Sequence, residues 1–83
     1  MQLVIVKFLD PTTFGHWATM EELTQSGCRV CIAAGWLIEQ TDDMVKVALL
    51  TTKEKDSVSN WVNIPVVAIL SIDVIKDISL EEL

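Results

Sequence analysis

The stretch that decides the fold is Asn60-Trp-Val-Asn-Ile-Pro-Val-Val-Ala-Ile-Leu-Ser-Ile-Asp-Val-Ile75, in which one proline joins two apolar runs. Pro65 has no N–H to donate to a sheet and fixes its own φ, so it should end one short strand and turn the chain tightly into the next. We therefore predict a strand over residues 61–64, a 3₁₀ turn over 65–68 and a closing strand over 69–75. Small five-stranded barrels turn their last corner in this way.

The preceding part of the chain predicts three further strands and one helix. β-Branched and alternating apolar residues place the strands at residues 3–9, 28–40 and 44–52. Thr19-Met-Glu-Glu22 matches a capping box, which predicts a short helix over residues 20–25 in a long first loop. The expected fold class is mainly β, a small five-stranded barrel with one short helix in the first loop.

One domain accounts for a chain of this length. We expect the barrel to occupy residues 1–76 and an acidic C-terminal tail to occupy residues 77–83. Residues 53–60 are polar and turn-prone, which predicts a loop between the strands expected at residues 44–52 and 61–64.

The longest predicted strand carries a regular apolar pattern interrupted by a glycine. Five residues alternate along one face, and this register predicts that Trp36 belongs to the core: Val30, Ile32, Ala34, Trp36 and Ile38. A glycine within a strand commonly marks a bulge or a sharp bend at a barrel corner. Gly35 therefore predicts one long strand shared by both halves of the barrel.

Composition and charge narrow the possible partners. Apolar residues make up 51% of the 83 residues, more than so small a core hides, which predicts a homo-oligomer, most simply a dimer, with its seam at residues 4–8 and 66–72. A formal charge of −6 repels phosphate and disfavours nucleic acid. No apolar run reaches the roughly 18 residues of a membrane span, and the N-terminus lacks the features of a signal peptide. We expect a cytoplasmic protein.

Reactive side chains are few and poorly spaced for catalysis. Cys28 and Cys31 form a C-x-x-C pair, but residues three apart in a strand point to opposite faces, so we expect neither a shared metal nor a disulfide. The single histidine, His16, has no nucleophile at a recognisable spacing. Adjacent carboxylates point apart and make no acid–base pair. The sequence predicts no enzyme, no metal and no cofactor.

The tryptophans give the clearest functional signal. Trp17 in the first loop, Trp36 just past the glycine and Trp61 at the start of the fourth strand are all placed to approach the same rim of a small barrel. Trp17 and Trp61 lie among polar residues, and with Phe14 and His16 they are the predicted binding residues. Aromatic rims bind peptides or stack on planar ligands. The competing interpretation is that both rings fill the core. For His16, a surface or capping role competes with a place in the pocket.

Short motifs in a fixed order accompany this pattern. They are a strand ending in Asp10, Gly-x-Trp at residues 15–17, a helix led by Met-Glu-Glu, Gly-Trp-Leu at 35–37 and Ile-Pro-x-x-x-Ile at 64–69. In this order, over residues 3–75, the chain resembles the short uncharacterised proteins of tailed bacteriophages and prophages. The resemblance implies a small Src-homology-3-like or Sm-like barrel with no activity attached. RNA binding is not implied, because the basic pore residues of Sm-like proteins are missing from this acidic chain.

Two functions remain after these exclusions. The first is a non-catalytic interaction module that binds a host or phage protein through its aromatic rim. The alternative is a small-ligand protein whose loop aromatics hold a planar molecule such as a nucleotide.

Overall fold

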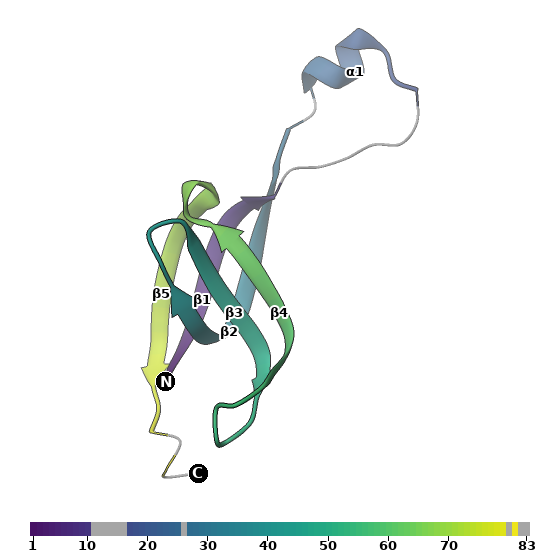
Figure 1. The fold of residues 1–83 in the computed structure, drawn as a ribbon. Coiled ribbons are helices and arrows are strands. Elements are labelled where there is room, and N and C mark those ends of the chain that lie inside the picture. Colours follow the sequence, from purple (N-terminus) through teal and green to yellow (C-terminus); the bar gives the residue numbers. More distant parts are fainter. Residues whose placement is uncertain (11–16, 26, 80, 82–83) are drawn as a thin grey trace.

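A computed structural model describes residues 1–10, 17–25, 27–79 and 81 of the chain. Over these residues the elements follow the order β1 (Gln2–Asp10), α1 (Met20–Gln25), β2 (Arg29–Gln40), β3 (Met44–Thr51), β4 (Val58–Pro65), η1 (Val66–Ala68) and β5 (Ile69–Asp77) (Figure 1). The mainly β class, the short helix and the 3₁₀ turn after Pro65 are confirmed. Three strands are longer than expected, because β1 spans Gln2–Asp10, β4 already begins at Val58 and β5 continues to Asp77.

All five strands belong to one antiparallel sheet. Their order across the sheet is β4-β3-β2-β1-β5, so the last strand returns to lie beside the first. Within the described part of the chain, β4 and β5 are the two edge strands and the sheet is open. Five antiparallel strands are thus confirmed, without the closure that would make them a barrel.

The core is small and comes mainly from alternate residues of three strands. Val4 and Val6 of β1, Val45 and Val47 of β3 and Ile64 of β4 are buried together. Since Val4 and Val6 are fully buried, they cannot contribute to the intermolecular seam expected at residues 4–8. Partly buried residues complete the core: Phe8, Ala33, Leu37, Ile69 and Ile72.

The structure reverses the predicted inner face of β2. Paired residues of antiparallel strands share a face, and Val4 and Val6 pair with Gly35 and Ala33. The small residues of β2 therefore face the core, and the larger alternate residues face outward. The prediction that Trp36 is a core residue is wrong, since Trp36 lies half-buried on the outer face.

Gly35 lies where β2 exchanges neighbours. The pairing with β1 extends to Trp36, and the pairing with β3 begins at Trp36. A Cβ atom on Gly35 would lie 2.4 Å from the carbonyl oxygen of Ala48, so this position requires glycine for the close approach of β3. The register irregularity itself falls between Leu37 and Glu39. The bulge therefore lies a few residues after the glycine and not at Gly35, where the sequence predicts it.

The helix α1 stands away from the sheet at the end of the β1–β2 ribbon (Figure 1). The backbone N–H of Glu22 donates to Oγ1 of Thr19 at 3.1 Å, which is the hydrogen bond that the capping box predicts. None of the α1 residues is buried. The projection makes the molecule elongated, with principal extents of 56 × 22 × 20 Å.

Candidate interaction surface

The structure places the predicted aromatic residues in separate regions. Phe14 and His16 lie outside the described residues. Trp17 precedes α1 on the projection and is 100% exposed, and Trp61 lies within β4 and is 59% exposed. Figure 1 shows α1 well away from β4, so Trp17 and Trp61 do not share one rim in this structure.

Trp61 instead belongs to a row that crosses three strands. Trp36 pairs with Ala48, and Ala48 pairs with Trp61, so the three residues share the outer face of the sheet. Ala48 has no exposed surface and lies outside the core cluster of Val4, Val6, Val45, Val47 and Ile64. Its cross-strand neighbours on both sides are tryptophans. We call Trp36, Ala48 and Trp61 the tryptophan platform.

The platform continues into further apolar surface. Leu50 follows Ala48 on the same face of β3 and is 55% exposed. Toward the other side, a shallow apolar groove of about 310 Å³ adjoins Trp36. The groove is lined by Leu3, Val4, Ile5, Ala34, Gly35, Trp36, Leu49 and Ile75. Every lining residue is apolar, so the groove suits aliphatic or aromatic side chains better than a polar ligand.

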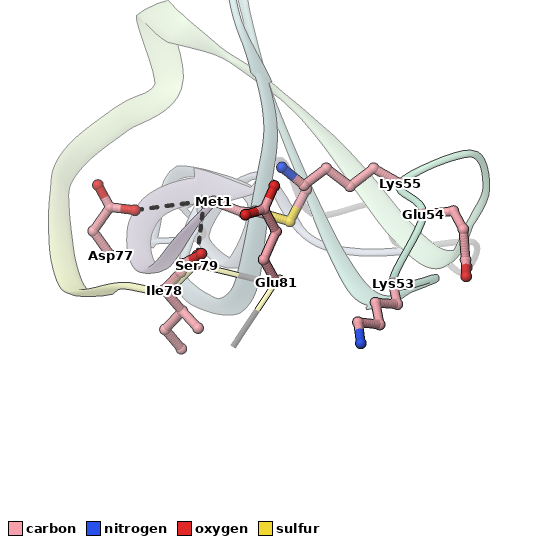
Figure 2. A pocket seen from close by; sticks show the side chains of 8 residues that line it. All are labelled: Met1, Lys53, Glu54, Lys55, Asp77, Ile78, Ser79 and Glu81. Atoms are coloured by element: carbon pink, nitrogen blue, oxygen red, sulfur yellow. Dashed lines mark hydrogen bonds and ion pairs between the residues drawn. The ribbon is translucent and has the colours of Figure 1, made fainter. Parts of the chain in front are cut away.

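A second, polar groove of about 730 Å³ lies where the chain ends approach the loop between β3 and β4. Figure 2 shows Lys53, Glu54 and Lys55 on one side and Asp77 on the other. The α-amine of Met1 donates to the carbonyl oxygen of Ile78 at 3.0 Å and to Oδ1 of Asp77 at 3.4 Å. Cationic and anionic groups alternate around this groove, so neither sign of ligand charge is selected.

The β3–β4 loop beside this groove is closed by its own hydrogen bonds. The Thr52 hydroxyl donates to Oδ1 of Asp56 at 2.6 Å, and the Asp56 N–H donates to the Thr52 hydroxyl at 3.2 Å. The hydrogen bond from Thr52 holds the pKa of the Asp56 carboxyl below its ordinary value. Asp56 is therefore a structural residue of the loop, already supplied with donors.

The two cysteines are both free thiols. Cys28 is exposed just before β2, and Cys31 is half-buried opposite Phe8 on the inner face. Within the described ranges, no three side chains of histidine, cysteine, aspartate or glutamate gather as a metal site would require.

Sequence reasoning missed the exposed apolar residues of α1, where Met20 and Leu23 are 74% and 58% exposed. In the adjoining ribbon, Val30 and Ile32 of β2 are 56% and 67% exposed, on the face that the sequence assigns to the core. The three-residue spacing of Met20 and Leu23 puts both on one side of a helix, which is a signal that the sequence does contain. This spacing alone does not show whether the two side chains pack on the sheet or stay exposed, because the position of α1 relative to the sheet decides that.

No family model, curated protein or solved structure matches this chain. None of the helices in the described ranges has the length and apolar character that a bilayer span requires.

Proposed function

We propose that this chain is a non-catalytic interaction module that binds a protein partner through the tryptophan platform. The observation that carries the proposal is the cross-strand row in which Trp36 and Trp61 flank the buried Ala48. The two rings are held by a paired sheet, so a partner meets a pre-formed apolar surface and little ordering is lost on binding. Tryptophan combines a large apolar area with one orienting N–H, and it is enriched where protein interfaces carry most of their binding energy.

The distribution of apolar residues supports a protein partner over a small ligand. Among the described residues, five apolar side chains form the buried core, whereas large apolar side chains remain exposed on β2, β3, β4, β5 and the projection. A surface of this extent is typical of proteins that cover it with another chain. Among its lining residues the apolar groove offers a nucleotide a single side-chain hydrogen-bonding group, the indole N–H of Trp36, and the polar groove presents it with carboxylates as well as lysines.

We further infer a small Src-homology-3-like or Sm-like barrel of a bacteriophage or prophage, acting on a host or phage protein. The five antiparallel strands, with β1 between β2 and β5, support the fold. Two free cysteines, one of them exposed, fit a reducing compartment such as the host cytoplasm.

Affinity capture with matched variants tests the function. The full chain is immobilised, incubated with bacterial lysate, and the bound material is identified by native mass spectrometry. We expect a protein that Trp61→Ala loses and that Val67→Ala retains, because Val67 is a 97% exposed apolar residue on η1, outside the platform. Equal capture by wild type and Trp61→Ala would contradict the proposal. A co-purifying small molecule in place of a protein would support the ligand-binding alternative.

A further inference from the structure

The β1–β2 ribbon carries an apolar stripe along its outer face. The register pairs Leu3 with Trp36, Ile5 with Ala34 and Leu9 with Val30, and all these residues face away from the core. Ile32 joins the stripe opposite Lys7. We call this set the outer stripe: Leu3, Ile5, Leu9, Val30, Ile32, Ala34 and Trp36. The apolar groove lies at one end of the outer stripe, and α1 projects beyond the other end (Figure 1).

The helix cannot cover the groove of its own chain. On β1 the groove is lined by Leu3, Val4 and Ile5, and the projection leaves the ribbon at the paired residues Asp10 and Arg29. From Val4, the middle one of the three, six residues of extended strand lead to Asp10, a distance of about 20 Å. The paired ladder between β1 and β2 keeps the ribbon extended, so an occupant of the groove must come from another molecule.

We propose that a second copy of this chain covers the outer stripe, in a symmetric dimer in which α1 of each copy seats in the apolar groove of the other. A surface with a groove at one end and an apolar projection at the other is complementary to itself when two copies stack antiparallel. This is the isologous contact that a two-fold axis requires.

Charge agrees with this arrangement. The outer stripe and α1 together supply 13 residues from each copy, fewer than the roughly 20–30 of a standard interface, so the dimer belongs to the weak class. The first turn of α1 carries Glu21 and Glu22, and its last turn carries no basic residue. The helix is therefore acidic. Near the groove, Lys76 pairs with Leu3 and Asp73 pairs with Ile5, and Lys7 lies on the same face of the sheet. This border therefore carries two ammonium groups and one carboxylate. The acidic helix therefore approaches a locally basic border.

Sedimentation equilibrium of paired variants tests the dimer. The helix variant carries Met20→Lys and Leu23→Lys, and the groove variant carries Ala34→Glu. We expect wild type to dimerise at tens of micromolar, and each variant alone to have a dissociation constant raised at least about tenfold. The control variant Val67→Asp, on exposed η1, should dimerise as wild type does.

Mixing the two variants makes the test specific. In a mixed pair, the native helix of the groove variant meets the native groove of the helix variant, and the introduced lysines meet the introduced glutamate. We expect the mixture to form heterodimers with near wild-type affinity. A monomeric wild type, an undiminished helix variant, or a mixture no better than its components would overturn the proposal. Circular dichroism verifies folding, and Met20→Ser with Leu23→Ser replaces the lysine pair if that variant is unfolded.

Trp36 belongs to both the tryptophan platform and the outer stripe, whereas Trp61 belongs to the platform alone. Trp61→Ala should therefore lose the captured partner and still dimerise, which separates the failure of one proposal from the failure of the other.

Discussion

Because Gly35 has no side chain, β3 can approach β2 closely at the point where β2 stops pairing with β1 and starts pairing with β3. An added Cβ would lie 2.4 Å from the carbonyl oxygen of Ala48 and 3.2 Å from Cγ1 of Val47, so the backbone itself would have to move. Overpacking of this kind costs about 1–3 kcal/mol. We predict that Gly35→Ala lowers the free energy of unfolding by this amount. Urea denaturation measures the change.

The matched control is Gly27→Ala, because nothing lies within 4 Å of a Cβ at Gly27. This substitution should change the free energy of unfolding by no more than about 0.5 kcal/mol. Equal stabilities of the two variants would show that β3 does not press on β2 at Gly35.

Asp56 gives the fold a defined response to acid. Its pKa is lowered from the ordinary 3.8, chiefly by the hydrogen bond from Thr52, so the folded loop favours the ionised carboxylate. The resulting stabilisation is present above the ordinary pKa and is lost as the pH falls through the lowered value. We predict that an NMR titration of the carboxyl carbon gives a midpoint below 3.8 for wild type and a higher one for Thr52→Val. Coinciding titration curves would refute the role of the Thr52 hydroxyl.

At the scale of elements, local chemistry predicted where strands and turns lie. Pro65 ends β4 as expected from its missing N–H, and Thr19 caps α1 as its spacing with Glu22 indicates. These features depend on residues close in sequence. The inward face of β2 depends instead on its neighbours, which the sequence pattern does not contain.

Either set of alternate residues in β2 could face the core, and the prediction chose the wrong set because it followed residue size. The larger set, with Ile32 and Trp36, was assigned to the inside. The sheet requires the smaller set there, because β3 approaches Gly35 too closely for a side chain. For the same reason the sequence does not predict the tryptophan platform. The cross-strand row of Trp36, Ala48 and Trp61 follows only from the register of the strands.

A matched pair of substitutions tests this assignment of faces. Ile32 is 67% exposed on the outer face, whereas Leu37 packs against the core. At a protein concentration low enough to keep the chain monomeric, Ile32→Ala should change the free energy of unfolding by about 0.5 kcal/mol or less. Leu37→Ala should lower it by about 2 kcal/mol. Thermal denaturation of the two variants measures both changes. A larger loss of stability in Ile32→Ala than in Leu37→Ala would show that Ile32 faces the core, as the sequence predicts.

The whole molecule divides into a folded sheet and a projection whose described residues, 17–25, 27 and 28, are all exposed. Asp10 pairs with Arg29 at the base of the projection, so the two strands are already adjacent there. A two-residue Asn-Gly turn closes antiparallel strands at this spacing. The projection can therefore be replaced without altering the paired part of β1 and β2.

We predict that replacing residues 11–28 by Asn-Gly leaves a folded sheet whose free energy of unfolding is within about 1 kcal/mol of the wild-type monomer. The physical reason is that every described residue of the removed segment is exposed, so its loss removes no core contact. The shortened chain should also fail to dimerise, since α1 is the part that seats in the second copy. Denaturation and sedimentation of this one variant separate the two properties. An unfolded product would show that the projection supports the sheet, whereas a folded dimer would show that the chains associate through a different surface.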